Sequence, residues 1–282
     1  MLKQVIAAIK PLDETAMAKC KVRLDNLTKP LGSLHSFEHL AHKMAGITGN
    51  PRPQLSFPCI VILNGSRRTS GMIEVFAAHV SAEIIAFDMN ADKMMNKEQM
   101  AHIMEKGIKI ACSAARAGSK VIGTGMVGAM NPSTVSDICS WYGRDDKSPI
   151  DALVATGSPE LAGLVGVILG AAAGGAAVVL DGLATSVAAL VAVRMAPQLK
   201  DYLIGSHFTS ERYHAEVMKL LDLPTYLSLG MNVGEGVGAV LGISLIQASL
   251  HVLNDMKTFG EAEVHVAEDG PGALVQKQEI RD

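Results

Sequence analysis

The sequence is short of cysteine, of aromatic residues and of excess charge, and each shortage excludes a class of function. Its four cysteines are far apart and form no C-x-x-C pair, which argues against disulfides and structural zinc and is typical of reduced cytosolic thiols. Aromatic residues make up 4% of the chain, and 25 basic against 28 acidic residues give a net charge of −3. Because stacking rings and a basic surface are both scarce, we expect no nucleic-acid partner and no binding to an anionic membrane.

The length and the apolar content favour a globular protein. With 282 residues, 49% of them hydrophobic, the chain can bury a large core, and we expect one large domain with a smaller appendage. The first ten residues are too few and too charged for a secretory signal. We therefore expect a cytoplasmic protein.

One uncharged run, residues 161–180, has the length of a membrane span. It contains five glycines and divides into a helix at about 159–173, a turn at Gly174 and Gly175, and a strand at 177–180. A buried helix followed by a buried strand explains the run better, so we expect no membrane partner.

Short apolar runs alternate with helical stretches along the chain. We predict strands at 59–63, 120–123, 176–180 and 202–205, and helices at 72–87, 96–118, 159–173 and 183–196. This alternation predicts an α/β fold, a parallel sheet with helices on both faces that is Rossmann-like. Ligands of such folds gather at the carboxyl ends of the strands, so we expect a site in the loops there.

The predicted division of the chain has three parts. Residues 46–236 form the α/β domain, which carries the active-site loops. Helices within 1–45 and 237–262 fall outside the alternation and form a small helical subdomain. The polar, glycine-containing residues 263–282 form a loosely ordered tail.

The most informative segment, residues 229–239, reads LGMNVGEGVGA and sets Glu235 between Gly234 and Gly236. A ligand can closely approach a glutamate whose neighbours lack side chains. The apolar run that follows, 240–253, predicts a dry environment, in which a carboxylate is a better base. A glycine-rich helix start, with Glu235 favoured by the helix dipole, is the alternative, and the local pattern leaves both open.

Residues 123–128 match the G-x-G-x-x-G pattern directly after a predicted strand, which is the context in which a helix start binds phosphate. No acidic residue ends a second strand about twenty residues on, as a dinucleotide site requires. We therefore expect no NAD and no other cofactor. Phosphate binding, close backbone approach and a plain tight turn all remain open for this segment.

His35, Glu38 and His39 match the H-x-x-E-H pattern of inverted zinc peptidases, and His42 lies one turn further on. The spacing places the three histidines on one helical face, where they could hold zinc. The sequence suggests no distant glutamate ligand, and a solvated helix that carries histidines is commoner. We expect no metal.

Six motifs, in order, resemble those of the nicotinate-nucleotide:dimethylbenzimidazole phosphoribosyltransferases, and together they span nearly the whole chain. They are LTKPLGSL at 27–34 (family LTKPPGSLG), GSPE at 157–160 (GGxE), VLDG at 179–182 (a strand ending in DG), His207 with Glu211 and His214 (HRSAEPGH), 229–239 (LGMRLGEGSGA) and MKTF at 256–259 (MATF).

The resemblance implies a reaction and a set of site residues. A cobamide lower-ligand base, a benzimidazole or a phenol, attacks the anomeric carbon of nicotinate mononucleotide, nicotinate leaves, and an α-ribotide forms with inversion. The family's catalytic base falls on Glu235. On this resemblance we expect the substrates to contact Gly125, Gly128, Asn131, Asp181, His207, Gly234 and Gly236.

Glu83 is a further candidate, because it falls where the family often has a glutamine near the lower-ligand base. An ionisable acceptor at this position suggests altered selection of the base. A solvated helix face explains Glu83 equally well.

This chain departs from the family pattern mostly on the side that holds the nucleotide phosphate. It has LNGSRR at 63–68 for an ADHGV-type motif, no glutamate in the loop at 125–133, Asn232 for an arginine, Phe208 for an arginine, Tyr213 for a glycine, and no counterpart between 131 and 151 of a glycine-rich segment and a lysine. Each lost charge-assisted hydrogen bond is worth about 1.5 to 3 kcal/mol.

These departures leave two functions open. The first is a phosphoribosyltransferase, or a subunit of one, which acts as the family's dimers do, either as a homodimer or as a heterodimer with a paralogous subunit. Heterodimers of unequal homologues are found among members that activate phenols. The second is a catalytically degenerate partner or small-molecule binding subunit that supports an active homologue.

Overall fold

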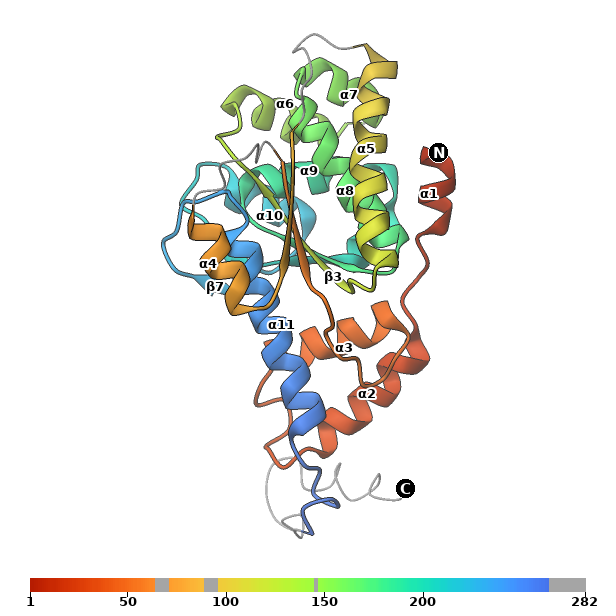
Figure 1. The fold of residues 1–282 in the computed structure, drawn as a ribbon, viewed down its shortest axis with the longest axis vertical. Coiled ribbons are helices and arrows are strands. Elements are labelled where there is room, and N and C mark those ends of the chain that lie inside the picture. Colours follow the sequence, from red (N-terminus) through yellow and green to blue (C-terminus); the bar gives the residue numbers. More distant parts are fainter. Residues whose placement is uncertain (64–70, 89–95, 145–146, 264–282) are drawn as a thin grey trace. The chain divides into compact units, whose positions relative to one another are not determined.

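The computed structural model describes residues 1–63, 71–88, 96–144 and 147–263 (Figure 1). Contacts within the chain divide it into two units. The sheet unit comprises Met1–Pro11 and Ser56–Ile243, and the helical unit comprises Leu12–Leu55 and Ser244–Asp282.

The two units differ from the predicted division at both ends of the chain. Residues 1–11, which the prediction places in the helical subdomain, group with the sheet. The last helix is divided after Ile243, whereas the predicted subdomain begins at residue 237. The predicted tail at 263–282 lies, from residue 264 onward, outside the described residues.

Five parallel strands form the centre of the sheet unit, in the order β2-β1-β3-β4-β5. They are β1 (Cys59–Leu63), β2 (Glu83–Phe87), β3 (Val121–Met126), β4 (Ala177–Leu180) and β5 (Leu203–Gly205). All residues of β1, β3, β4 and β5 are buried, because helices cover both faces of their apolar strands. These four strands and the α/β fold class are confirmed.

Helices surround this sheet. Within the described residues they are α1 (Leu2–Ala8), α4 (Gly71–His79), α5 (Lys97–Arg116), α6 (Pro132–Tyr142), α7 (Pro149–Thr156), α8 (Pro159–Ala173), α9 (Leu183–Met195), the 3-10 helix η1 (Pro197–Tyr202), α10 (His214–Leu221) and α11 (Val237–Asp255). A second, two-stranded parallel sheet pairs β6 (His207–Phe208) with β7 (Leu227–Ser228).

The prediction of one helix over 72–87 is wrong. Helix α4 ends at His79, and the chain then turns through Ser81, whose φ of +53° is left-handed and ends the helix. The next residues, Glu83–Phe87, form the edge strand β2 along β1. The β-branched pair Ile84 and Ile85 favours a strand, and pairing with β1 overrides the apolar periodicity that favoured a helix.

The uncharged run at 161–180 forms α8, a turn and β4, as predicted. Within the described residues one helix, α11, is long and apolar enough to cross a membrane by length and composition alone. Just over half of its most apolar window, 56%, is buried inside the protein, as in a core helix.

The strand order places a change of direction at the centre of the sheet. From β1 the chain first adds β2 on one side and then returns to add β3 on the other. The connections that leave β1 and β3 therefore run in opposite directions, and in such sheets a crevice for a ligand lies between them at the carboxyl ends of these two strands. The loop after β3 is therefore where the fold favours a site.

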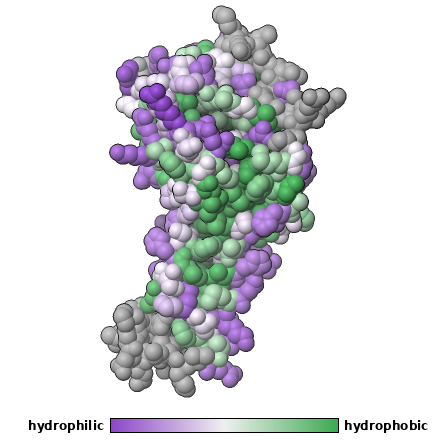
Figure 2. All heavy atoms as spheres, turned by 90° about the vertical axis from the view of Figure 1, so that its left-hand side faces the viewer, coloured by the Kyte–Doolittle hydropathy of each residue, from purple (hydrophilic) through white to green (hydrophobic). Residues whose placement is uncertain are grey.

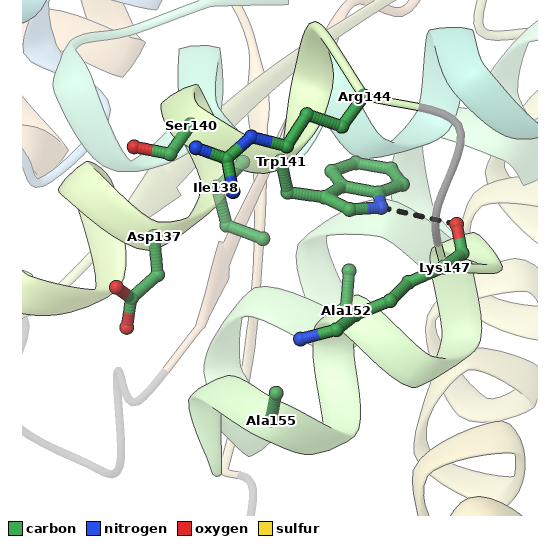
Figure 3. Close-up of a pocket in the computed structure, with 8 residues that line it drawn as sticks. All are labelled: Asp137, Ile138, Ser140, Trp141, Arg144, Lys147, Ala152 and Ala155. Carbon is green, nitrogen blue, oxygen red and sulfur yellow. Dashed lines mark hydrogen bonds between the residues drawn. The ribbon is translucent and has the colours of Figure 1, made fainter.

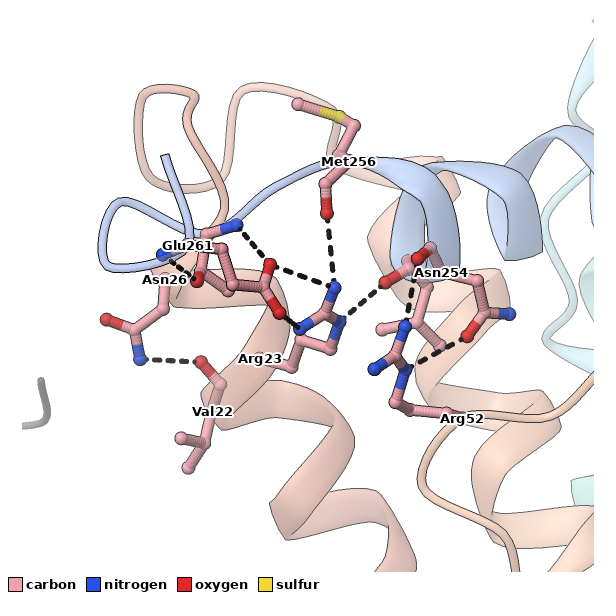
Figure 4. A network of polar contacts seen from close by, with 9 residues as sticks. Val22, Arg23, Asn26, Arg52, Asn254, Met256 and Glu261 are labelled. Atoms are coloured by element: carbon pink, nitrogen blue, oxygen red, sulfur yellow. Dashed lines mark hydrogen bonds and ion pairs between the residues drawn. The ribbon is translucent and has the colours of Figure 1, made fainter. Parts of the chain in front are cut away.

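The helical unit contains α2 (Glu14–Asn26), α3 (Ser36–Thr48) and the end of α11. Arg23 on α2 donates hydrogen bonds to the carbonyls of Leu253 at 2.8 Å and Met256 at 3.1 Å, and pairs with Glu261 at 2.9 Å (Figure 4). The guanidinium of Arg23 lowers the pKa of Glu261 to about 2. One arginine thus fastens the segment after α11 to α2.

Candidate active site

Two adjoining cavities open beyond the carboxyl ends of β3 and β4. The first, of about 310 Å³, contains Glu235 and is lined by the loop after β3, the start of α9, Glu211 and residues 232–235. The second, of about 340 Å³, lies at the starts of α6 and α8 and shares Met126, Ala129 and Met130 with the first. We call them the Glu235 cavity and the α6/α8 cavity. They occupy the sheet edge that the fold favours for ligands.

Glu235 lies beside the carboxyl end of β3. It is half-buried and lines the cavity together with Gly234, Val233 and Asn232. The carbonyl of Gly234 accepts a hydrogen bond from the Met126 N–H at 2.9 Å, so the glutamate's loop is fastened directly to the end of β3.

Close packing between that loop and β3 explains Gly125, the second glycine of the G-x-G-x-x-G pattern. A Cβ atom on Gly125 would lie 2.7 Å from the Gly236 nitrogen and 2.8 Å from its Cα, closer than real contacts allow. Gly125 therefore makes a close backbone approach within the protein. Gly128 of the same pattern lines the Glu235 cavity, and Asn131 caps α6 and lines the α6/α8 cavity.

Asp181, directly after β4, holds the loop of Glu235 from behind. Its buried carboxylate accepts hydrogen bonds from the backbone N–H groups of Gly236 at 2.9 Å, Gly238 at 2.7 Å and Ala239 at 3.2 Å. Burial raises the pKa of Asp181 to about 7, and the three N–H donors oppose that rise. Asp181 lines neither cavity, so its contacts are those of a positioning residue.

His207 is packed beneath the same loop. Its buried ring lies against Gly238, where any Cβ atom would overlap it, and its Nδ1 lies 3.1 Å from the Ser206 hydroxyl. Its Nε2 has no hydrogen-bond partner among the described residues. Burial lowers the pKa of His207. Burial also lowers the pKa of nearby His214 to about 4, and the positive charge of His207 contributes to that shift. His207 lines neither cavity.

Glu83 lies apart from the other candidates. It is the exposed first residue of β2 and is aligned with Cys59, the first residue of β1. The cavities lie beyond the last residues of the strands. Because a five-residue strand is about 13 Å from first to last Cα, Glu83 is at the opposite end of the sheet from Glu235.

The cavities also contain residues that the site prediction left out. Glu211 and the start of α9, Leu183–Thr185, line the Glu235 cavity, and Ser158, Thr134 and Glu160 line the other. Glu211 belongs to the HRSAEPGH-like segment, and α9 begins directly after the DG pair, so both carried a sequence signal. Their convergence on Glu235 arises only from the tertiary fold.

The charge in these cavities is negative. Carboxylates of Glu211 and Glu235 line the first and Glu160 the second, whereas no lysine or arginine in the described part of the chain lines either. The described residues contain no group of three or more His, Cys, Asp or Glu that could hold a metal, and His35, His39 and His42 form none. Proton transfer to a carboxylate is the chemistry that this arrangement supports most directly.

Comparison with known proteins gives consistent matches. A family model described as phosphoribosyltransferase matches residues 9–86 and 135–264. A nicotinate-nucleotide–dimethylbenzimidazole phosphoribosyltransferase of Roseiflexus sp. (strain RS-1) is 33% identical, over 94% of this chain and 98% of that protein, and one of Chloroflexus aggregans is 32% identical over the same shares. A crystal structure of the enzyme of that name from Thermus thermophilus matches with a TM-score of 0.81 at 22% sequence identity. The match covers 91% of this chain and all of the Thermus chain. A second crystal structure, titled CobT from the same organism, matches with a TM-score of 0.80.

The matches are incomplete in the region where this chain departs from the family pattern. The alignment with the Roseiflexus protein extends over 345 positions, more than the 282 residues of this chain, so that relative has segments without a counterpart here. The family model leaves out residues 87–134, which contain β3 and the loop that lines both cavities.

Proposed function

Because the chain belongs to the nicotinate-nucleotide–dimethylbenzimidazole phosphoribosyltransferase family, we propose that it transfers phosphoribose from nicotinate mononucleotide to an aromatic lower-ligand base of a cobamide. The product is an α-ribotide, and the acceptor is a benzimidazole or a phenol. The observation that supports the proposal is that Glu235 is half-buried in a cavity at the carboxyl edge of the sheet. The resemblance of residues 229–239 to the family's motif is what assigns the catalytic base to Glu235.

In this reaction Glu235 is the general base. It takes the proton from the acceptor's ring N–H or hydroxyl while that nitrogen or oxygen forms a bond to C1′ of the donor. The bond between C1′ and nicotinate breaks on the opposite side, and its electron pair passes to the pyridinium nitrogen. Deprotonation of the acceptor by a positioned carboxylate is worth on the order of 10² to 10⁴ in rate.

Two residues behind the loop fix the position of this base. Asp181 binds three backbone N–H groups that follow Glu235, and Gly125 lets the loop lie directly on β3. A base held in this way needs little reorganisation when the acceptor arrives. Positioning of this kind supplies a large part of the rate of a bimolecular reaction.

We propose that the donor's phosphate binds at the start of α9. Leu183, Ala184 and Thr185 line the cavity of Glu235. The first amides of a helix have no partner within it, and the helix dipole favours an anion there. Because no described cation lines the cavity, this anchor is weaker than one built with lysine or arginine.

A second subunit is part of the proposal. Apolar side chains are exposed on α4 and near β6 and β7: Val75 is 69% exposed, Leu229 55% and Phe208 40%. Figure 2 views the side on which α4 and β7 lie in Figure 1, and apolar side chains gather on that face. Exposed apolar patches of this kind mark subunit contacts. The partner is a second copy of this chain or a paralogue.

Two observations favour the alternative, a degenerate subunit that supports an active homologue. The two cavities lack a described cation, and the family model omits the segment with the loop after β3. Both features concern the donor's side of the site. A chain of this kind retains the base and leaves phosphate binding to its partner.

Release of nicotinate separates the two functions. The purified chain is incubated with nicotinate mononucleotide and either dimethylbenzimidazole or phenol, alone and after co-expression with a paralogue. We expect release by the isolated chain and a loss of about 10² or more in Glu235→Gln, which keeps the shape of the side chain but accepts no proton. Release only with the paralogue supports the degenerate subunit, and no release in either case contradicts the proposed transfer.

A further inference from the structure

A further cavity, of about 440 Å³, lies between α1 and the last turns of α5 and α8 (Figure 1). We call it the α1/α5 cavity. It shares no lining residue with the Glu235 cavity or the α6/α8 cavity. Because α5 leads into β3 and α8 into β4, their last turns lie at the amino edge of the sheet, opposite the candidate active site.

The α1/α5 cavity exists because α1 covers a groove beside α5 without filling it. The groove has a closely packed floor: a Cβ atom on Gly170 of α8 would lie 2.6 Å from the Ile108 carbonyl of α5, and the Cys112 thiol donates to the Gly170 carbonyl at 3.5 Å. No residue of α1 is buried. The chain just after α1 is held where the Tyr202 hydroxyl donates to the Lys10 carbonyl at 2.9 Å. The space between the helix and the floor therefore remains open.

The surface that faces this cavity is mostly apolar and is accessible to a ligand. Val5 on α1, Cys112 on α5 and Ala173 on α8 are each half-buried, so the protein itself leaves part of these side chains uncovered. A ligand that covers them removes apolar surface from water, which favours binding.

The cavity between α6 and α7, of about 300 Å³, is built in the opposite way (Figure 3). Its apolar residues, Ile138, Trp141 and Ala152, are already buried by the protein, and polar and charged side chains surround the opening. The indole N–H of Trp141 is also satisfied, because it donates to the Lys147 carbonyl at 3.1 Å. Of these two cavities, the α1/α5 cavity is therefore the one that suits an apolar ligand.

The charge around the α1/α5 cavity is positive. Lys109 and Arg116 line it, and no aspartate or glutamate of the described residues does. Neither cation forms an ion pair within the described part of the chain. They lie on the same face of α5, about 10 Å apart along the helix. Accessible apolar surface beside unpaired cations is complementary to a molecule with an apolar body and an anionic end.

Lys109 is the better partner for that anion. Arg116 lies in the last turn of α5, where the unpaired carbonyls of the helix end disfavour an anion, whereas Lys109 lies two turns earlier. From Ile108 to Arg116 the lining extends about 12 Å along α5. A groove of this length suits an extended chain better than a compact ring.

We propose that the α1/α5 cavity is a binding site for a medium-chain fatty acid. The carboxylate pairs with Lys109, and the chain lies along the groove against Val5, Cys112 and Ala173. Contact of the chain with accessible apolar side chains supplies the affinity, and Lys109 selects the anion. The site rests on its own geometry and not on the proposed transfer.

Cys112 reports occupancy, because its half-buried thiol lines the cavity. The full-length protein is alkylated with iodoacetamide, with and without octanoate below its micelle-forming concentration, and peptide mass spectrometry gives the rate at each cysteine. We expect saturating octanoate to slow the reaction of Cys112 at least tenfold. Cys139, which is also half-buried but lies on α6, is the internal control and should react at an unchanged rate.

Three results of this experiment would overturn the proposal. Octanoate could leave the rate at Cys112 unchanged, or it could protect Cys139 equally, which would indicate adsorption of octanoate over the whole surface. A Cys112 that does not react even without octanoate would show that another part of the protein, or a second copy of it, already covers the cavity.

Related probes separate the chain from the charge. Octylammonium has the same chain and the opposite charge, and acetate has the same charge without the chain. We expect each to protect Cys112 with an affinity at least tenfold below that of octanoate. Equal protection by octylammonium would contradict the role of the cations, and equal protection by acetate would contradict the apolar groove.

Variants locate the carboxylate. Lys109→Gln removes its proposed partner, and we expect octanoate to bind at least fivefold more weakly, with a smaller loss in Arg116→Gln. Lys106→Gln, an exposed position of the same helix that does not line the cavity, is the matched control and should bind octanoate unchanged. Unchanged binding in Lys109→Gln, or an equal loss in Lys106→Gln, contradicts the site. Should Lys109→Gln fail to fold, the probes on the unaltered protein still decide the outcome.

Discussion

The two sides of the Glu235 cavity are built in different ways. On the side of the base, Asp181 is buried and binds three N–H groups, and the loop of Glu235 lies in direct contact with β3. On the side where the donor's phosphate is proposed to lie, polar backbone and carboxylates line the cavity, and no described cation does. The difference indicates that the fold constrains the position of the proposed base more strongly than it constrains the side where the donor is proposed to bind.

The largest effect is expected from adding a methyl group where the loop meets β3. In Gly125→Ala the new Cβ would lie 2.7 Å from the Gly236 nitrogen, so the loop of Glu235 has to move. Displacement of a catalytic group by about 1 Å costs on the order of 10² in rate. Steady-state nicotinate release measures the loss. Gly143→Ala, where a Cβ meets nothing within 4 Å and which lines neither cavity, is the control for the added methyl group alone.

Replacement of Asp181 tests how strongly the loop of Glu235 must be held in place, because Asp181 binds that loop and does not line the cavity. Asp181→Asn places an amide where three N–H groups require acceptors, and we expect activity to fall about tenfold to a hundredfold, with kcat affected more than KM. Steady-state kinetics with each substrate varied provide the measurement. An unchanged kcat would show that Asp181 does not position Glu235.

The same substitution has a pH signature. Because burial raises the pKa of Asp181 from 3.8 to about 7, the folded protein holds more protons than the unfolded chain between these values. The contribution of Asp181 to the free energy of unfolding is therefore greatest below about pH 4 and declines as the pH rises to about 7. Urea unfolding of the unaltered protein and of Asp181→Asn between pH 4 and 7 tests this contribution. The difference between their free energies of unfolding should shrink as the pH rises.

His214 predicts the opposite slope in the same range. Burial lowers its pKa from 6.5 to about 4, so the folded protein holds fewer protons than the unfolded chain. Its contribution to stability is present above pH 6.5 and is lost as the pH falls to about 4. His214→Gln keeps an acceptor for the Thr209 N–H and should remove this acid sensitivity in urea unfolding. An unchanged pH profile would contradict a buried neutral histidine.

The smallest effect is expected at Glu83, which lies at the amino end of β2. Glu83→Gln should change nicotinate release, and the preference between dimethylbenzimidazole and phenol, by less than twofold. A tenfold change in that preference would mean that the amino end of the sheet, and not only its carboxyl end, participates in the choice of acceptor.

The sheet could be predicted from the sequence because its central strands are unbroken apolar runs, such as Cys59–Leu63, which only burial on both faces explains. The edge strand β2 could not, because its half-exposed residues follow α4 without an evident break. The helices α6 and α7 were within reach: Asn131 with Pro132, and Ser148 with Pro149, are helix caps followed by proline at the first helical position.

The candidate site was partly predictable for similar reasons. Glycines around Glu235 are a local signal, and the structure accounts for them. A Cβ on Gly234 would contact Met126 at the end of β3, one on Gly236 would lie 3.0 Å from Ile60 on β1, and one on Gly238 would overlap His207. The anchoring of the loop by Asp181 joins residues 55 positions apart in the chain, and no local pattern contains that pairing. The position of Glu83 at the amino end of β2 could not be predicted for the same reason that β2 was missed, since it depends on where the edge strand begins.

Chemical rescue at Glu235 tests whether this carboxylate is the general base. Glu235→Ala removes the base and leaves space in the cavity, and formate in solution can take the place of the carboxylate. We predict that Glu235→Ala releases nicotinate about 10² or more times more slowly than the unaltered protein, and that the rate rises in proportion to added formate. A Glu235→Ala protein that releases nicotinate at the unaltered rate, with no response to formate, would contradict the account.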